Sequence, residues 1–338
     1  MDLSAGVLAL LQKPSTVLLS VGSTFSLTSL LCALCLAAAV MAVRRRRRNR
    51  PLQVRTLVRA LFPKRIMTSR SFTTDVLYFL LALFVFGVIF GWALVSYQVV
   101  SNAVTGFLAA HFGAREATSL PGIAARSVIT LALFLAYELG YWFDHYLKHR
   151  VPILWEFHKV HHSATVLTPL TIFRVHPVDS IIFANIVALS TGIANGVMNY
   201  AFGITTYPYA VTDTNLILVL FIHGYIHLQH SHVWISFSGL LGRILLSPAH
   251  HQIHHSDNPI HFDKNLGSTL AIWDWLFGTL YVPKRQAEKL TFGVESSHPD
   301  AHTLPYTLFE PVRRAGAHIR SLLRRSLAPG NAPRRVVD

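Results

Sequence analysis

Residues 144–162 read DHYLKHRVPILWEFHKVHH, and the histidine spacing in this stretch decides how the rest of the sequence is interpreted. His145 and His149 are four residues apart, a separation that places two side chains on one face of a helix. The stretch then carries three histidines at i, i+3 and i+4, which are His158, His161 and His162. Neutral imidazole is a ligand for Zn, Cu, Fe and Ni, so the stretch predicts a metal site.

Further groups of histidines lie downstream. The i, i+3, i+4 spacing recurs at His251, His254 and His255. A stripe at i, i+4 and i+7 carries His223, His227 and His230, and on this spacing alone His227 is a candidate ligand. The eight imidazoles of the main clusters exceed the roughly four ligands of one tetrahedral zinc ion. The sequence therefore predicts two metals, each with several nitrogen ligands and room for an exogenous one.

The composition indicates a membrane protein. Of the 338 residues, 52% are hydrophobic and only 14% are charged, whereas a soluble domain of this length has about a quarter charged residues. Disordered and collagen-like chains are excluded by the same numbers. Long runs without charge, apart from Glu138, occupy residues 17–43, 76–100, 127–143, 181–212 and 216–222. The first is long enough to cross a bilayer core of ~30 Å, so we predict an all-α, polytopic membrane helical bundle.

The basic residues predict an orientation for this bundle. Eleven Lys and Arg residues lie between Arg44 and Arg70, whereas only Arg115 and Arg126 separate the second run from the third. Because cytoplasmic loops carry the excess of positive charge, the arginine-rich segment and every histidine cluster are expected on the cytoplasmic side. Gly203 and Pro208 should break the fourth run into a hairpin. The membrane is expected to be a bacterial inner membrane or the endoplasmic reticulum.

Membrane orientation also explains the net charge of +14. The sequence contains no basic-aromatic nucleic-acid module, so no nucleic-acid partner is expected. The chain divides into residues 1–70, with the first span and the basic segment, residues 71–283, with the membrane-embedded histidine domain, and residues 284–338, a basic tail. Within the tail, residues 308–327 are compatible with an amphipathic helix on anionic headgroups or with a partly disordered segment.

The order of the motifs resembles the fatty acid hydroxylase/sterol desaturase superfamily over residues 130–283. Besides residues 144–163, the resemblance lies in TIFRVHP at 171–177, His230-Ser231, Ser247-Pro248, HQIHHS at 251–256, NLG at 265–267 and WDWLFGT at 273–279. The chain departs from the common pattern at Tyr146, His232 and Leu266, where many members carry Arg, Asn and Tyr. None of these departures removes a ligand position.

The resemblance implies a non-haem di-iron site at the cytoplasmic face of a helical membrane domain. Members use O2 and two electrons to hydroxylate or desaturate an unactivated C–H bond of a lipid. The implied activity is that of an oxidoreductase with two Fe ions, which Zn could replace in a purified form, and with an external electron donor or reductase. The ligand positions correspond to His145, His149, His158, His161, His162, His230, His251, His254 and His255.

Six other residues are candidates for supporting or substrate-binding roles. Asp144, Asn265 and Asp274 could orient ligating imidazoles through the second ring nitrogen. Arg174 and His176 could contact substrate or support the ligands, and His232 could replace an asparagine that does so. The alternative is loop capping for Asn265 and Asp274 and a structural His-Pro turn for His176.

Two alternative functions remain open from the sequence. A metal transporter or sensor would place polar residues within its spans, whereas the dense clusters here follow the ends of the predicted spans. A metal-dependent lipid hydrolase would use the same topology with zinc and water, and its activity would persist without oxygen.

Overall fold

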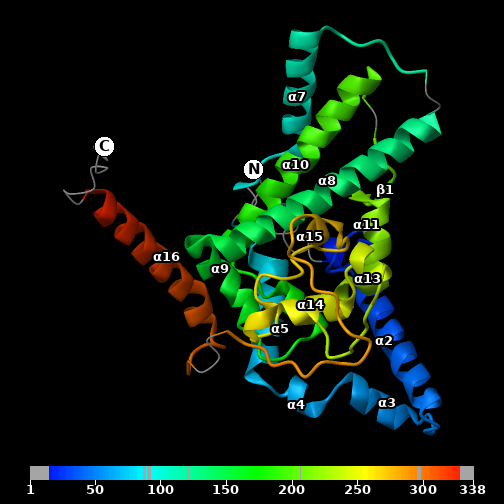
Figure 1. The fold of residues 1–338 in the computed structure, drawn as a ribbon, viewed down its shortest axis with the longest axis vertical. Helices are drawn as coiled ribbons and strands as arrows, with labels where there is room; N and C mark the ends of the chain where they lie inside the picture. Colours follow the sequence, from blue (N-terminus) through cyan, green and yellow to red (C-terminus); the bar gives the residue numbers. More distant parts are fainter. Residues whose placement is uncertain are drawn as a thin grey trace, which may run out of the picture.

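The computed structural model describes residues 15–86, 89, 93–119, 122–205, 207–294 and 298–327. The regular secondary structure of the described chain is mostly helical, which confirms the predicted all-α class (Figure 1). Its main helices are α2 (Leu27–Arg47), α3 (Val54–Leu61), α4 (Lys64–Met67), α5 (Arg70–Leu81), α7 (Tyr97–Phe112), α8 (Gly122–Arg150), α9 (Pro152–His162), α10 (Pro177–Phe202) and α16 (Leu304–Leu327). Shorter helices are α11 (Leu216–Phe221), α12 (His227–Gln229), α13 (Leu241–Ile244), α14 (Pro248–His254) and α15 (Ile272–Leu276).

Tighter and wider helical turns complete the structure. The π-helices are η1 (Ala82–Phe86) and η4 (Ile222–Ile226), and the 3-10 helices are η3 (Pro169–Phe173) and η5 (Pro259–His261). The strands β1 (Ala210–Val211) and β2 (Thr214–Asn215) form an antiparallel hairpin in which Ala210 pairs with Asn215 and Val211 with Thr214. The predicted break after α10 is confirmed, because Gly203 ends the helix in the left-handed conformation with φ 65°.

Within the described parts of the chain, three helices, α2, α8 and α10, are long and apolar enough to cross a membrane. The count rises to four if the pair 54–67 and 70–86, which is bent by 92°, forms one span. The predicted second span at residues 76–100 is wrong as a single helix. Within the described residues, α5 passes into a π-helix at Ala82, and a new helix begins at Tyr97 after an extended Ser96. The first span also begins later than its apolar run, because the Ser26 hydroxyl caps α2 by accepting from Thr28 N.

Small residues let the long helices approach closely. On α10, a Cβ atom added to Gly192 or Gly196 would lie 2.6 to 2.8 Å from backbone carbonyls or β-carbons of α7. On α8, a Cβ atom added to Gly140 would lie 2.3 Å from Ser190 Oγ of α10. The Gly-x-x-x-Gly spacing of α10 therefore permits the contact between α7 and α10 that is visible in Figure 1.

The site lies below these helices, where α8 ends and α9 and α14 begin (Figure 1). Proline stands at the first position of α9, α10 and α14, at Pro152, Pro177 and Pro248. Proline suits this position because the first turn has no acceptor for its N–H, so each prolyl residue starts a helix at a defined point. The three helices thereby enter the site region with fixed register.

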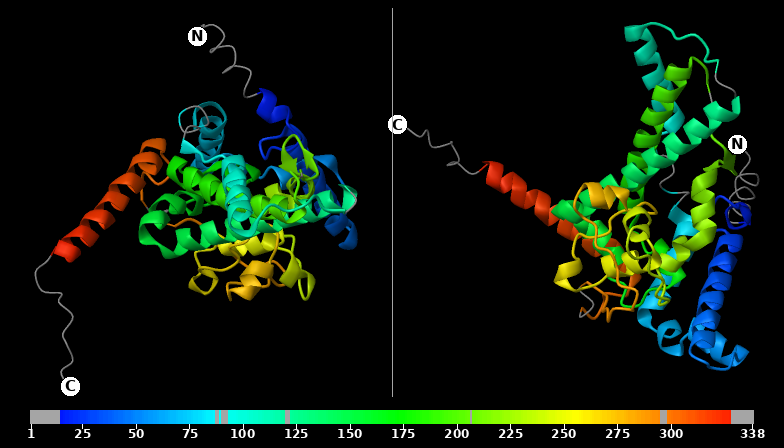
Figure 2. Two further views of the ribbon diagram at one scale, coloured as in Figure 1. Left: turned by 90° about the horizontal axis from the view of Figure 1, so that it is seen from above. Right: turned by 45° about the vertical axis from the view of Figure 1, so that its right-hand side comes forward.

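The C-terminal helix α16 packs against α9 over its first half, as far as His318, which contacts Glu156, and its end extends away from the other helices in both views of Figure 2. Of the two alternatives for residues 308–327, the structure therefore has the helix. Its exposed apolar side chains include Phe309, Val312 and Ile319. Its contact with a lipid surface stays a prediction.

Candidate metal centre

Nine buried or nearly buried histidines form two groups in which one ligand atom from each ring lies within 4.8 Å of the others. The first group contains His145, His149, His158, His162 and His254. The second group contains His161, His230, His251 and His255. Four helical segments contribute to the two groups, so the predicted convergence of the clusters is a property of the folded chain.

Neighbouring histidines in the sequence enter different groups. His161 and His162 are consecutive on α9, and their rings are inclined by 88°. His254 and His255 are consecutive at the end of α14, and their rings are inclined by 82°. Successive residues of a helix project about 100° apart, so a His-His pair can serve two adjacent ions at once. This is why each i, i+3, i+4 cluster supplies both groups.

The first group has the donor set that a metal ion requires. The Nε2 atoms of all five rings are buried and have no hydrogen-bond partner among the described residues. For four of the five rings, the opposite nitrogen has an acceptor. His145 Nδ1 donates to Leu266 O at 2.7 Å, and His254 Nδ1 donates to Lys264 O at 2.9 Å. His158 Nδ1 lies 2.8 Å from Asp179 Oδ2, and His149 Nδ1 lies 3.3 Å from Asp263 Oδ1. In these four rings the acceptor holds the proton on Nδ1 and leaves the Nε2 lone pair free to bind a metal ion.

The second group is more compact. His251 Nε2 lies 2.9 Å from His230 Nε2, and His255 Nε2 lies 3.1 Å from both of these atoms. His161 Nε2 lies 3.0 Å from His230 Nε2, while its Nδ1 faces Arg174 O at 3.3 Å. Four ring nitrogens that meet in this way cannot all be satisfied by one another's protons. A metal ion among them would satisfy all four, so both groups fit a two-metal site.

Burial also keeps the imidazoles in the metal-binding form. Burial lowers the pKa of His161, His162 and His255 well below the ordinary value of 6.5, and the neighbouring imidazoles lower it further. Burial likewise lowers the pKa of His251 to about 3. These rings are therefore neutral at pH 7, as coordination requires.

The structure does not bring His227 and His232 to the other nine histidines. His227 is fully buried, but its Nε2 lies 3.0 Å from Ser29 Oγ of α2. His232 Nε2 lies 2.8 Å from Ala60 O of α3. In both cases a contact with a distant segment uses the ring, and the spacing along the chain gives no sign of that contact.

The other candidates support the site from greater distance. The Asp144 carboxylate pairs with Lys148 at 2.6 Å and contacts no ligating ring by a hydrogen bond among the described residues. His176 caps α10 through Val178 N, and its Nε2 faces Leu308 O at 3.0 Å. Neither His176 nor Arg174 lines the main cavity, and Arg174 supports a ligand through its backbone carbonyl, which faces His161 Nδ1.

Asp274 and Asn265 fix the loop that holds the ligands. Asp274 accepts from Leu266 N at 2.8 Å and from Gly267 N at 2.9 Å, and Leu266 O in turn accepts from His145. Asn265, with φ 57°, donates to His250 O and accepts from Tyr281 N. Both residues therefore hold the backbone next to the ligating histidines, whereas the prediction had them contact the ligating rings themselves.

Sequence reasoning missed Asp179 and Asp263, the two carboxylates that face ligating rings. Asp179 is buried in the first turn of α10 and pairs with Lys148 as well as with His158. An acidic residue in a first helical turn usually signals only a favourable interaction with the helix dipole. Its position two residues after the His176-Pro177 pair was the available signal. Asp263 lies in a loop with φ 57°, and no motif or spacing in the sequence pointed to it.

Asp179→Asn is expected to weaken metal binding in the first group about 10- to 100-fold, because the carboxylate orients His158 and increases its basicity. Competition with a chelator of known affinity would measure the change. Asp257→Asn is the control, since the exposed Asp257 accepts from Thr291 Oγ1 and contacts no ligand. Equal metal affinity in the two variants would contradict this role of Asp179.

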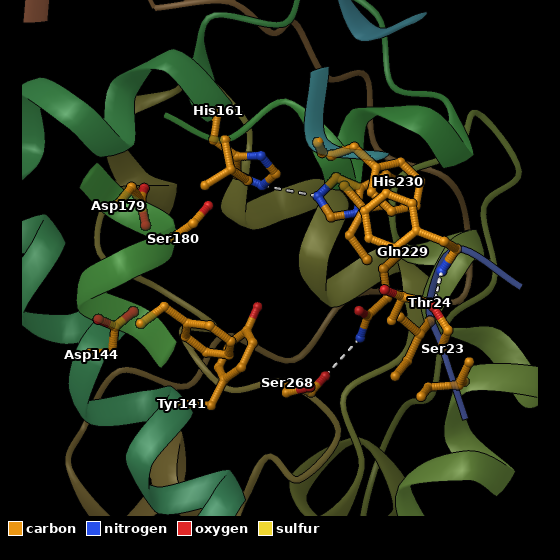
Figure 3. Close-up of a pocket in the computed structure, with 18 of the residues that line it drawn as sticks. Ser23, Thr24, Tyr141, Asp144, His161, Asp179, Ser180, Gln229, His230 and Ser268 are labelled. Carbon is orange, nitrogen blue, oxygen red and sulfur yellow. Dashed lines mark hydrogen bonds between the residues drawn. The ribbon is translucent and has the colours of Figure 1, made fainter. Parts of the chain in front are cut away.

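A cavity of about 660 Å³ adjoins the histidines (Figure 3). His145, His158, His161 and His230 form part of its wall. The polar lining residues close to these ligands are Asp144, Lys148, Asp179, Ser180, Gln229 and Ser268. Further along the same helical segments, the lining residues are Phe183, Leu218, Ile222 and Ile226. Apart from Ser23, Thr24 and Thr214, the cavity is therefore polar at the histidines and mainly apolar beyond them, which suits an amphiphilic molecule.

Comparison with known proteins agrees with this geometry. Residues 130–279 match the model of the fatty acid hydroxylase family. A human alkylglycerol monooxygenase is 31% identical over 193 residues, which cover 56% of this chain and 36% of that protein. An ornithine lipid hydroxylase from Rhizobium tropici is 28% identical over 160 residues, which cover 46% of this chain and 43% of that protein.

The alkylglycerol monooxygenase from Xenopus tropicalis is 32% identical over 182 residues, which cover 53% of this chain and 34% of that protein. The chain thus spans about a third of the length of the alkylglycerol monooxygenases it matches. No solved structure matches the chain significantly. The matched segment, residues 130–279, contains all nine histidines of both groups, and it is this segment that is similar to the fatty acid hydroxylase family.

Proposed function

We propose that this chain is a membrane-bound, O2-dependent di-iron lipid hydroxylase. The observation that carries the proposal is the meeting of two buried imidazole groups with a cavity that is apolar away from them. Oxidation of an unactivated C–H bond requires a redox metal with free coordination positions. The named relatives, a monooxygenase and a hydroxylase of lipids, favour hydroxylation over desaturation.

The nine histidines of the two groups would hold the iron ions. When bound, the two ions would supply the activation of O2 and the oxidising power for the C–H bond. In a balanced hydroxylation, one oxygen atom becomes the hydroxyl of the product and the other leaves as water. Two electrons and two protons are consumed, and an external donor protein or reductase would supply the electrons.

The residues of the chain have the remaining tasks. Asp179, Asp263 and the carbonyls of Leu266 and Lys264 keep the rings oriented, so the ligand geometry exists before substrate enters. The apolar part of the cavity would bind the hydrocarbon portion of the lipid and exclude water. The polar part, where Gln229 Nε2 donates to Ser268 O at 2.7 Å, would face the headgroup (Figure 3). An alkylglycerol is the first substrate to test, by analogy with the relatives.

We further propose that the chain is an integral membrane protein whose arginine-rich end of α2, Arg44–Arg47, lies on the cytoplasmic side. The electron donor would then approach from the cytoplasm. We propose that this membrane is a bacterial inner membrane or the endoplasmic reticulum.

Purified protein with iron, a chemical reductant and ¹⁸O2 is expected to convert an alkylglycerol into a product that carries one ¹⁸O atom. Mass spectrometry of the product measures the incorporation, and an anaerobic reaction is the control. A lipid metallohydrolase would remain active without oxygen and would take its oxygen from water. Anaerobic turnover, or product free of ¹⁸O, would therefore contradict the proposed hydroxylase.

A further inference from the structure

The cavity has a wall that lies outside the family segment. Gly22, Ser23, Thr24 and Phe25 line it, although they precede residue 130 by more than a hundred positions. In Figure 3, Ser23 and Thr24 lie on the opposite side of the cavity from Asp144 and Tyr141. The cavity is therefore enclosed by three parts of the chain: the family segment, the N-terminal residues 22–25 together with Val17, and Ala82 and Phe86 of η1.

The β-hairpin holds this N-terminal wall at one end. Gly22 N donates to Thr212 Oγ1 at 2.8 Å, and Thr214 Oγ1 donates to Gly22 O at 2.9 Å. A Cβ atom at Gly22 would lie 2.5 Å from Thr214 Oγ1 and 2.7 Å from the backbone carbonyl of Val211. Since a backbone atom blocks the space, only glycine permits this close approach.

The histidine stripe holds the wall at its other end. His223 Nε2 lies 3.1 Å from Thr28 Oγ1, and His227 Nε2 lies 3.0 Å from Ser29 Oγ. His230, the next member of the stripe, belongs to the second metal group. The first turn of α2 is thus attached to the same short segment that delivers a ligand. The contact with Ser29 gives His227 the role of holding the start of α2, which is separate from metal binding.

An aromatic side chain forms the apolar part of the wall. The Phe25 ring lies 4.4 Å from the Phe173 ring and 5.8 Å from the Phe79 ring, measured between centroids. Phe25 and Phe173 line the cavity, whereas Phe79 lies behind them on α5 and is not among its lining residues. Phe25 therefore limits the width of the cavity, and Phe79 supports the cluster without reaching it.

We propose that residues 22–25 form one side of the substrate-binding site and that Phe25 determines which lipid chains fit. The catalytic part of this inference rests on the proposed hydroxylase function. The contact between Phe25 and the hydrocarbon chain of an amphiphilic lipid does not depend on catalysis.

A photoreactive lipid tests the contact independently of turnover. An alkylglycerol with a diazirine in its alkyl chain is bound to the full-length protein, irradiated, and located by peptide mass spectrometry. Cross-links are expected on residues 22–25 as well as on α8 and α10. Cross-links confined to α8 and α10 would overturn the inference, even if the protein oxidises lipid. Cross-links on residues 22–25 in a protein that oxidises no lipid would support the inference and refute the proposed function.

Substrate selectivity tests Phe25 itself. Phe25→Leu is expected to raise the ratio of kcat/KM for a methyl-branched over an unbranched alkylglycerol about tenfold, because a shorter side chain widens the cavity. Phe79→Leu removes the same atoms from the same aromatic cluster and should change this ratio less than twofold. Thermal unfolding of both variants confirms that they are folded. Equal ratios in Phe25→Leu and Phe79→Leu would overturn the role of Phe25.

Discussion

His161→Ala is expected to abolish lipid oxidation and to release the metal of the second group. His161 Nε2 meets His230 Nε2 at 3.0 Å, so the substitution removes one of only four nitrogens. Loss of a residue that merely orients a ligand costs about 10- to 100-fold in metal affinity or activity, and loss of the ligand itself should exceed this. We expect activity below about 1% of the wild-type value.

Metal analysis by mass spectrometry and the ¹⁸O2 assay measure the two effects. His111→Ala is the matched control, because His111 is exposed on α7 and its Nδ1 donates to Phe107 O of the same helix at 2.8 Å. Two metals per chain and full activity are expected for this control. A His161→Ala protein that keeps both metals and its activity would refute the ligand assignment.

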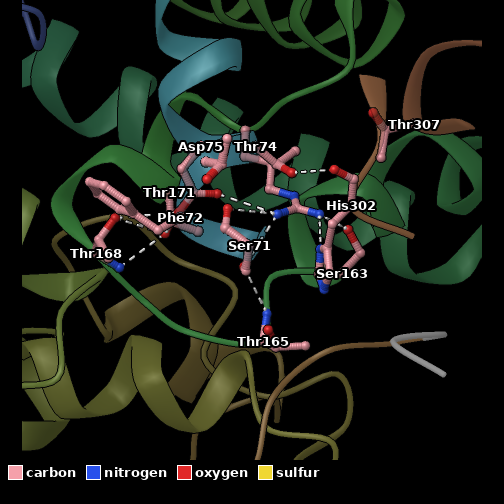
Figure 4. Close-up of polar contacts among 12 residues, drawn as sticks. Ser71, Phe72, Thr74, Asp75, Ser163, Thr165, Thr168, Thr171, His302 and Thr307 are labelled. Carbon is pink, nitrogen blue, oxygen red and sulfur yellow. Dashed lines mark hydrogen bonds and ion pairs between the residues drawn. The ribbon is translucent and has the colours of Figure 1, made fainter. Parts of the chain in front are cut away.

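Arg174→Ala is expected to cause the largest loss of stability. The Arg174 side chain is fully buried, and its guanidinium lies 3.4 Å from Asp75 Oδ1 and donates to Ser163 Oγ at 2.8 Å. Figure 4 labels Asp75 and Ser163 within this network of polar contacts. It also donates to Val160 O and Ala301 O. Removing one partner of a buried ion pair costs about 3–5 kcal/mol, because the remaining charge is left uncompensated.

The thermal midpoint in detergent measures this effect. A double variant, Arg174→Met with Asp75→Leu, removes both charges and should recover part of the loss, because no buried charge then remains unpaired. If the double variant is as unstable as Arg174→Ala, packing rather than charge explains the loss. An unchanged midpoint in Arg174→Ala would contradict the structural role of the ion pair.

The Arg174 contacts also explain why its role was not evident from the sequence. Asp75 belongs to α5, and Ala301 precedes α16, so both partners lie outside residues 130–279. The motif around Arg174 suggested a contact with substrate or ligands. Its backbone carbonyl does face His161 Nδ1, but its side chain joins three distant parts of the chain. Sequence spacing carries information on neighbours along one helix and none on such partners.

The sequence by itself determined the helical class, the histidines that could share a helical face, and the break at Gly203. These features depend on the period of the helix and on backbone conformations that a few residues fix locally. It did not determine the break between α5 and α7, because an apolar run of residues 76–100 is equally compatible with one helix or two.

Only the tertiary structure decided how the histidines divide and what surrounds them. His161 and His162 enter different groups because histidine rings from other helices lie beside each of them. His227 faces Ser29 because α2, far away in the chain, supplies that hydroxyl. The same reason applies to Asp179 beside His158 and to Phe25 at the cavity. Contacts between segments far apart in the chain depend on the packing of whole helices, which no local pattern encodes.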